Sequence, residues 1–350
     1  MRRHRIVVAV LAIVLLAVAF RLALPTLVER YLNHALSRNP AYLAHIGDVG
    51  LALWKGGAVV KDVAIAKRTG RVPVPLFAAS RIEVSISWRA LGRGALVANT
   101  AVDEPRINLV AGPTPEERQT GSEVDWRKVA DELMPIRVDR LVVSDGELHF
   151  RNFHSSPQVD VYLHHVDLVA ENLTNSEKLS KTRVARIALR AVPMKGGRLL
   201  ARASFDPFAE TPTFDFDGSL VGLRLADWNA FFRAYAGFDV ERGTARAYAE
   251  LESSKNRFDG YIKPFFQDVE VFTPEEARDE SFFTAAWEAV VQGIQEFLED
   301  RSTDRVASRI PLAGSVRDPR IGFWATLGTA LRNAWIESLA PQLEHSVGRG

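Results

Sequence analysis

The chain has 350 residues and a nearly balanced charge, with 44 Lys and Arg against 43 Asp and Glu. This balance argues against a dedicated nucleic-acid binder, whose basic excess would dominate the composition, so we expect no nucleic-acid partner. The sequence contains no cysteine, which excludes disulfides, iron–sulfur clusters, thiol nucleophiles and thiolate zinc sites. Hydrophobic residues make up 47% of the chain, enough for a folded core.

The N-terminal residues have the pattern of a membrane anchor. Residues 1–5 include three arginines, and residues 6–20 carry no polar side chain. As a helix at about 1.5 Å per residue, residues 6–28 are long enough to cross a hydrocarbon core of about 30 Å. The basic cluster then predicts a cytoplasmic N-terminus and export of the rest of the chain. We expect a single-pass anchor at 6–28, followed by a helical linker at 29–45.

A cleaved signal peptide is the alternative interpretation of the same residues. Ala17-Val18-Ala19 fits a small-x-small cleavage site. The apolar pattern continues past that site into Leu22, Leu24 and Val28, which favours an uncleaved anchor. Both interpretations place the remaining chain beyond the membrane.

From residue 46 to residue 316 the dominant hydrophobic period is two, which predicts β-strands. Gly56-Gly57 separates the first two alternating runs and predicts a tight hairpin turn. The runs lie at 48–54, 58–67, 81–88, 107–111, 136–143, 147–152, 159–163, 166–170, 184–192, 199–205, 214–220, 245–251, 258–271 and 306–316. We expect twelve to fifteen strands, and their short connections predict antiparallel pairing between neighbours in sequence. In the hairpin, Val49, Leu51 and Leu53 are expected to face Val59, Val63 and Ile65.

The alternation changes phase at His164-His165. Val161 and Leu163 precede this pair with odd numbers, whereas Val166 and Leu168 follow it with even numbers. Such a change predicts a β-bulge or a strand break. The eight histidines of the chain could also supply metal ligands, but a site needs about three convergent ligands with supporting contacts. We expect structural histidines and no metal site.

Few segments have helical spacing. Beyond the anchor, they lie at 125–133, 226–235, 274–298 and 321–339, the last within a C-terminal amphipathic helix that we assign to 317–350. The aromatic helix at 226–235 is expected either to close one end of the sheet or to pack in an ordinary core. The final helix is expected to pack on the sheet or to lie on a membrane surface.

A sheet of a dozen alternating strands has one apolar face that must be covered. The chain has too few helices for a parallel α/β fold. A closed β-sandwich, a barrel, and a long sheet bent into a trough that is open to acyl chains all remain possible folds. The hydrophobic pattern alone favours the closed β-sandwich.

Sequence motifs spread along the chain resemble those of a known family. They are Tyr31-Leu32-Asn33, Ile46-Gly47-Asp48-Val49, Leu51–Gly57, Ser87–Leu91, Glu104–Asn108, Asp145-Gly146, His149-Phe150-Arg151, Gly237–Val240, Gly260–Pro264 and Leu331–Ala334. In these motifs the chain resembles the AsmA-like superfamily, in particular the short bacterial proteins with domain-of-unknown-function family 748. The resemblance implies a bacterial inner-membrane protein with a periplasmic β-groove, similar to larger relatives implicated in phospholipid transport to the outer membrane.

We therefore expect a mainly β protein with a few helices, in which an N-terminal transmembrane helix precedes an elongated, curved antiparallel β-groove at 46–316. The closed β-sandwich remains the alternative. A dozen strands spaced about 4.8 Å apart give a sheet roughly 60 Å long. That length is too short to bridge the envelope alone, which leaves three alternatives: partner proteins, self-assembly, or a role that does not bridge the envelope.

Motifs of catalysis are absent from the sequence. It contains no phosphate-binding loop, no dinucleotide fingerprint and no Gly-x-Ser-x-Gly nucleophile elbow. The acidic pair Asp215 and Asp217 alternates with apolar residues and is expected to keep the outer face of a strand soluble. We expect no enzyme activity and no cofactor, although a hydrolase whose residues converge only in space is a third hypothesis.

The favoured function is a membrane-anchored module that binds or transfers phospholipid or another acyl-chain ligand. The alternative is an envelope scaffold that recruits protein partners. The residues expected to line the lipid groove are Leu51, Leu53, Val63, Ile65, Val84, Ile86, Ile107, Leu109, Val142, Phe150, Leu189, Phe205, Phe216 and Ile262. Arg183, Arg186 and Arg190 are candidates for lipid headgroup contact, although a solvated outer face is the favoured interpretation of these arginines.

Overall fold

The computed structural model describes residues 15, 23–30, 33, 41–52, 56–120, 136–174, 184–206, 213–236, 238–254, 257–272 and 310–315. The helices expected at 125–133, 274–298 and 317–350, and most of the span expected at 6–28, lie outside these residues. Within the described part of the chain, no helix is long and apolar enough to cross a membrane.

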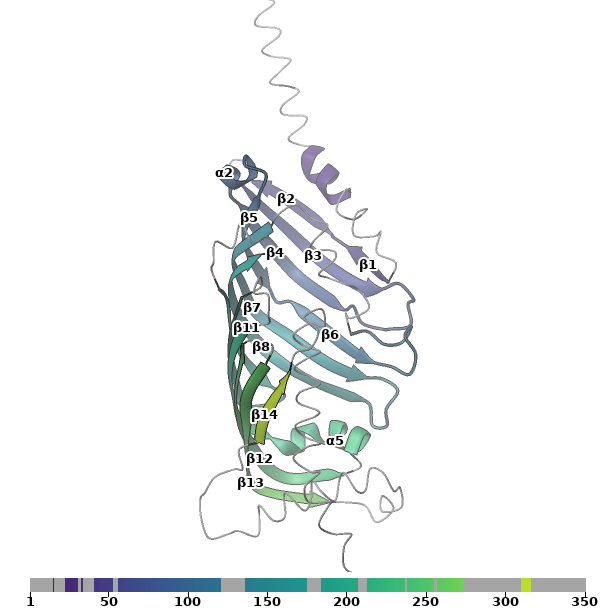
Figure 1. The fold of residues 1–350 in the computed structure, drawn as a ribbon. Helices are drawn as coiled ribbons and strands as arrows, with labels where there is room; N and C mark the ends of the chain where they lie inside the picture. The colour runs from purple at the N-terminus through teal and green to yellow at the C-terminus, as the bar shows by residue number, and fades with distance from the viewer. Residues whose placement is uncertain are drawn as a thin grey trace, which may run out of the picture.

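The described strands form one mixed sheet of fourteen strands (Figure 1). The strands are β1 (Tyr42–His45), β2 (Asp48–Ala52), β3 (Gly57–Lys67), β4 (Phe77–Ile86), β5 (Leu96–Asp103), β6 (Arg106–Ala111), β7 (Ile136–Asn152), β8 (Val159–Thr174), β9 (Ala185–Pro193), β10 (Arg198–Asp206), β11 (Thr213–Arg224), β12 (Asp239–Ser254), β13 (Arg257–Phe272) and β14 (Ile310–Ser315). The helical elements between them are α2 (Trp88–Leu91), η2 (Leu225–Trp228) and α5 (Asn229–Ala236). The prediction of a mainly β fold with few helices is confirmed.

The sheet is not purely antiparallel. Its main path runs β1-β3-β4-β5-β7-β8-β9-β10-β11-β12-β13-β14, with β2 beside β3 and β6 between β4 and β7. Both β5 and β6 pair with β7 in the parallel direction. The expectation of antiparallel neighbours is wrong here, because the long connection between Ala111 and Ile136 can reverse the chain before β7 begins.

Two further expectations from the sequence need correction. Tyr42–His45 was assigned to a helical linker, but it forms β1 and pairs with the end of β3. Four residues are too few to show a period of two, so this strand has no clear sequence signal. In the first hairpin, Val49 pairs with Val60 rather than Val59, so Val59 lies on the opposite face.

A row of β-bulges crosses the sheet. Positive φ angles occur at Asp62 (51°) in β3, Glu104 (50°) between β5 and β6, Asp145 (53°) in β7 and His165 (48°) in β8. Register shifts continue this row in the pairs of β11 with β12 and of β12 with β13. Each bulge bends its strand and increases the local twist. Together they account for the trough shape of the sheet in Figure 1.

The bulge at His165 confirms the phase change seen in the sequence. The pairing of β8 with β9 shifts between His164 and Asp167. β8 itself continues without interruption to Thr174, so the two alternating runs expected there belong to one strand. A bulge adds one residue to the strand, so the residues facing the apolar side have odd numbers before the bulge and even numbers after it. Val161 and Leu168 therefore both lie on the apolar side.

Apolar packing is divided into four small clusters along the sheet. The first contains Ile46 and Val49 and is covered by Val28 of the helical residues 23–30. The second and third involve α5 and η2, and the fourth is formed by Leu251 and Phe258 with their neighbours in β11, β13 and β14. All of these clusters lie on the same side of the sheet.

Asparagine side chains attach the helical segments to the strands. The amide of Asn33 donates to the carbonyl oxygen of Ile46 (3.3 Å) and accepts from its backbone N–H (2.9 Å). Asn229 makes the same pair of bonds with Val240, at 2.9 and 2.8 Å. Ile46 and Val240 are both buried, so these bonds satisfy backbone groups that water cannot reach.

Candidate functional site

One row of paired residues crosses the sheet from β2 to β14 on its apolar side. Each member is paired by register with the next: Leu51, Ala58, Val84, Thr100, Leu141, Ala170, Ile187, Ala203, Phe216, Leu251, Gly260 and Leu312. We call this row the apolar ladder. No member is charged, and Thr100 is the one polar side chain in it. Paired residues share a face, so the ladder is a continuous apolar strip along the trough.

The neighbouring row on the opposite face is polar. We call it the polar ladder, and it consists of Ser85, Asn99, Arg140, Glu171, Arg186, Ser204, Asp215, Glu252 and Asp259. The two ladders are offset by one residue on each strand, so along these two rows apolar and polar side chains lie on opposite faces of the sheet. One face of the sheet is therefore suited to water and the other to an apolar ligand or cover.

The middle of the apolar ladder retains contact with solvent. Ala170, Leu251 and Leu312 are buried, whereas Ile187 and Phe216 between them are only half-buried. All fourteen described strands belong to one sheet, so among the described residues no second sheet faces this strip. A half-exposed apolar strip of this kind provides contact area for a hydrocarbon chain.

Helix α5 covers the apolar side at one place. It follows β11 and packs across the ends of β7 and β8, where the rings of Phe150 and Phe231 are 6.3 Å apart and those of Phe150 and Tyr235 are 6.2 Å apart. The helix predicted at 226–235 is therefore confirmed as η2 and α5. It contributes to the core at one part of the trough (Figure 1), where it contacts β8 and β12.

Most of the residues predicted to line the groove lie on the apolar side by register. They are Leu51, Val63, Ile65, Val84, Ile86, Ile107, Leu109, Phe150, Leu189, Phe205, Phe216 and Ile262. Leu53 lies outside the described residues. Val142 is placed differently: it pairs with Val169 on the polar side. The bulge at Asp145 changes the parity within β7, so Val143 is the residue that shares a face with Phe150.

The arginines predicted to contact headgroups lie on the polar side. Arg186 is the second residue of β9 and belongs to the polar ladder. Arg190 forms an ion pair of 2.8 Å with Asp167, and this contact is the main reason why the pKa of Asp167 lies below its ordinary value. Arg183 lies outside the described residues. Arg186 thus lies near the end of β9, at the edge of the trough that is formed by the strand ends. Arg190 lies in the middle of β9, paired with Asp167.

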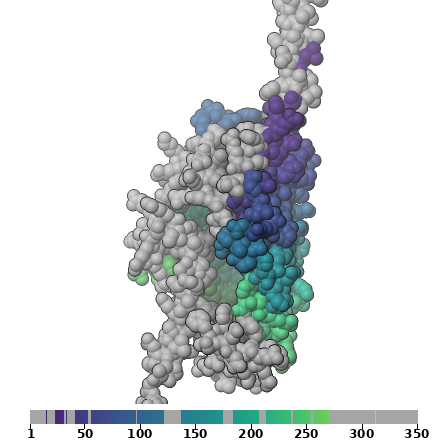
Figure 2. Space-filling model, turned by 90° about the vertical axis from the view of Figure 1, so that its right-hand side faces the viewer, coloured from purple at the N-terminus to yellow at the C-terminus, as the bar shows by residue number. Residues whose placement is uncertain are grey.

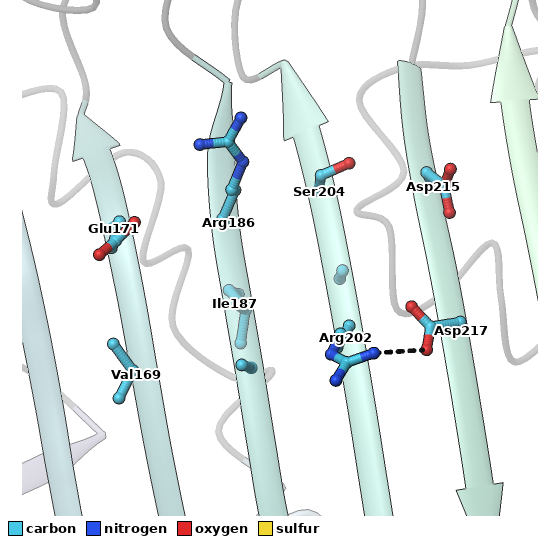
Figure 3. A pocket seen from close by; sticks show the side chains of 10 residues that line it. Val169, Glu171, Arg186, Ile187, Arg202, Ser204, Asp215 and Asp217 are labelled. Carbon is cyan, nitrogen blue, oxygen red and sulfur yellow. Dashed lines mark ion pairs between the residues drawn. The ribbon is translucent and has the colours of Figure 1, made fainter.

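Two open depressions lie on the polar side of β7–β11. The first has a volume of about 450 Å³, and Figure 3 shows its charged side chains around Val169, including an ion pair of 3.9 Å between Arg202 and Asp217. The second, of about 510 Å³, adjoins it around Val142. Arginines and carboxylates mix in both, and no group of three metal-ligating side chains occurs among the described residues.

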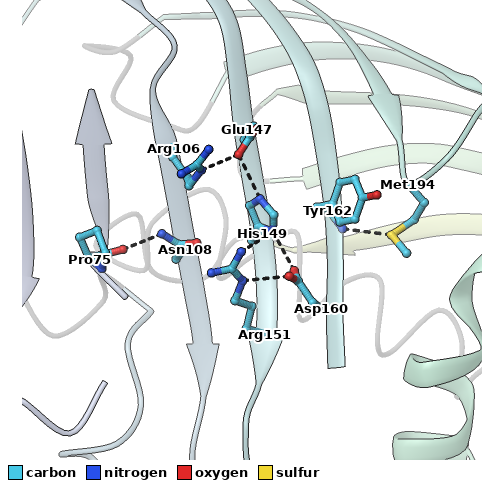
Figure 4. A network of polar contacts seen from close by, with 9 residues as sticks. All are labelled: Pro75, Arg106, Asn108, Glu147, His149, Arg151, Asp160, Tyr162 and Met194. Carbon is cyan, nitrogen blue, oxygen red and sulfur yellow. Dashed lines mark hydrogen bonds and ion pairs between the residues drawn. The ribbon is translucent and has the colours of Figure 1, made fainter. Parts of the chain in front are cut away.

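A buried histidine centres the densest polar network (Figure 4). The Nδ1 atom of His149 is 2.7 Å from a carboxylate oxygen of Asp160, and its Nε2 atom is 3.3 Å from Glu147. Arg106 bonds to Glu147, which lowers the pKa of the Glu147 carboxyl, and Arg151 lies 3.2 Å from Asp160. These paired opposite charges join β6, β7 and β8 on the polar side of the sheet.

No family model matches the chain, and no curated protein matches it.

Proposed function

We propose that this protein is a membrane-anchored lipid-binding or lipid-transfer module, in which acyl chains lie along the apolar ladder. The observation that supports this proposal is the continuity of the ladder across twelve strands, from β2 through β3 to β14, without a charged side chain. The resemblance to AsmA-like proteins leads to the same proposal. The anchor would be formed by residues 6–28, with the trough on the periplasmic side of a bacterial inner membrane.

The energetics of burial favour an acyl ligand on this strip. Each methylene group transferred from water to an apolar surface contributes about 0.8 kcal/mol. Association and ordering of a ligand cost at least about 4 kcal/mol, so several methylenes must be buried before binding becomes favourable. Neighbouring strands are about 4.8 Å apart, so an acyl chain along the ladder contacts several strands at once. A headgroup would then lie near the rim, where strand-end polar residues such as Arg186 are placed.

The proposal is tested by two substitutions at neighbouring positions on β9. Leu189 lies on the apolar side, and Ala188 lies on the polar side. We expect Leu189→Asp to reduce the phospholipid that co-purifies with the full-length chain, because a carboxylate in the strip opposes burial of hydrocarbon. The measurement is phospholipid per chain by mass spectrometry after extraction in mild detergent.

Ala188→Asp is the matched control, because it adds the same charge one residue away on the other face. Both variants keep the same N-terminal residues, so any lipid held by the anchor is common to both. Equal lipid content in the two variants, with unchanged strand content by circular dichroism, would overturn the proposal. If the unsubstituted chain purifies without phospholipid but with a bound protein partner, the scaffold alternative is favoured.

A further inference from the structure

The connection between β4 and β5 carries an exposed aromatic side chain. This connection consists of Ser87–Ala95 and contains α2, and we call it the Trp88 corner. Trp88 is 50% exposed. A single exposed apolar side chain needs no explanation, but the surroundings of this one are unusual in their rigidity, charge and position.

Hydrogen bonds hold the corner in place. The backbone N–H of Ile86 donates to the carbonyl oxygen of Gly56 (2.7 Å), and that of Ser87 donates to Val97 (2.8 Å). Gly56 has a φ of +67°, and a Cβ atom at this position would lie 3.1 Å from Nε1 of Trp88. The indole therefore rests against the backbone of the turn before β3, which supports it while leaving half of its surface in solvent.

The charge of the corner is entirely positive. Residues 84–102 contain two charged side chains, Arg89 and Arg93, and both are exposed. The nearest acidic residues in the sequence, Glu83 and Asp103, are engaged with Arg81. The two arginines thus have no acidic neighbour within their own segment.

The corner lies at the end of the sheet where the chain enters it. Val28 of the helical residues 23–30 packs against the buried cluster of Ile46, Val49 and Val63 at this end. Figure 1 shows α2 level with these helical residues, and Figure 2 shows the same arrangement from a second direction. Leu27 of the same helical segment is 51% exposed. The residues before this segment are the apolar run that we assign to the membrane anchor.

We propose that the Trp88 corner is a membrane-contact site that binds the anionic phospholipid surface next to the anchor. Tryptophan is favoured at the level of lipid headgroups, where its ring is half in an apolar and half in a polar environment. Arginines near the surface are attracted to anionic headgroups. The inference takes the anchor from the proposed function, but it does not depend on lipid binding in the trough. A second attachment point would fix the tilt of the trough, with its first strands against the membrane.

The absence of native cysteine makes this contact directly measurable. A spin label is attached to single-cysteine variants of the full-length chain in vesicles of phosphatidylcholine with phosphatidylglycerol. Its accessibility to oxygen and to an aqueous nickel chelate then reports its depth. We expect a label at Arg93→Cys to lie at the headgroup level, a label at Leu15→Cys to lie in the hydrocarbon, and a label at Leu200→Cys to remain aqueous. Leu200 is 41% exposed and lies in the depression on the polar side of the sheet.

Each outcome distinguishes the corner from the anchor. A deep label at Leu15→Cys with an aqueous label at Arg93→Cys overturns the membrane contact while the anchor stands. An aqueous label at Leu15→Cys overturns the anchor and the contact with it. Adding Trp88→Ala and Arg89→Glu to Arg93→Cys is expected to move its label into water. If the label stays at the headgroup level despite these two substitutions, proximity to the anchor alone sets its depth, and the proposed role of Trp88 and Arg89 is overturned.

Discussion

The ion pair of Arg106 and Glu147 makes the free energy of unfolding depend on pH in a way that can be measured. The bond from Arg106 is the largest cause of the lowered pKa of Glu147, whose ordinary value is 4.5. A carboxyl with a lower pKa in the folded state contributes stability above about pH 4.5 and loses this contribution as the pH falls through the folded value. The network in Figure 4 should therefore weaken in acid.

We expect Arg106→Gln to lower the free energy of unfolding at pH 7 by up to about 1 kcal/mol, because the pair is partly exposed to solvent. The difference from the unsubstituted protein should shrink as the pH falls below 4.5, where the carboxyl of the unfolded state is protonated. Urea unfolding between pH 3 and pH 7 measures both quantities.

Arg202→Gln is the control for this experiment. Arg202 is 78% exposed and lies 3.9 Å from its partner Asp217, so its removal should change stability little at any pH. A difference that stays constant with pH in Arg106→Gln would contradict the role given to Glu147.

At the scale of the strand, the bulges decide which residues reach the apolar side. In β7 the bulge at Asp145 places Leu141 and Val143 on the same side as Leu148 and Phe150. A strand with uninterrupted alternation would instead put Val142 on that side. This difference can be tested with two adjacent substitutions.

Val143→Asp is expected to lower the free energy of unfolding by roughly 2 kcal/mol, because it places a carboxylate at a half-buried position on the apolar side, opposite Leu168. Val142→Asp is expected to cost less than about 0.5 kcal/mol, because Val142 pairs with Val169 on the polar side of the sheet. Thermal or urea unfolding of both variants gives the comparison. The opposite order of stabilities would show that β7 alternates without a bulge.

The sequence allowed the bulge to be predicted in β8 but not in β7, for a physical reason. In β8, apolar side chains stand on both sides of His164-His165, so the change of parity is visible. In β7, Val142 and Val143 are adjacent and both apolar, so the pattern fits either parity. A local period of two cannot choose a face when both neighbours have equal hydrophobicity.

Strand β5 was not among the strands predicted from the sequence, and the reason is related. Its sequence, Leu96–Asp103, carries Asn99 and Thr100 on opposite faces and therefore shows weak alternation. It is stabilised by antiparallel pairing with its sequence neighbour β4 and by parallel pairing with β7, which is distant in sequence. Such long-range pairing overrides local strand propensity, and no local pattern can reveal it.

For the whole molecule, the alternation predicted the strand content and the existence of one apolar face. It did not decide between a closed sandwich and an open trough, because both bury the same face. The arrangement depends on strand order, which places all described strands in one sheet, and on the row of bulges that bends it. The polar ladder, the parallel strands and the Trp88 corner likewise depend on register and topology.

The central claim is that the apolar ladder carries acyl chains along its length. Photo-crosslinking in the full-length chain tests this claim directly, with benzoylphenylalanine placed at one position at a time. The test positions Val84, Ile187 and Phe216 lie on the apolar ladder, and the control positions Glu83, Arg186 and Asp215 lie one residue away on the polar side.

We expect phospholipid adducts at Val84, Ile187 and Phe216 after irradiation of vesicle-reconstituted protein, with none at the three controls. Intact-mass spectrometry identifies each adduct. Equal adducts on both faces, or adducts confined to Val84 near the chain entry, would contradict a lipid path along the sheet.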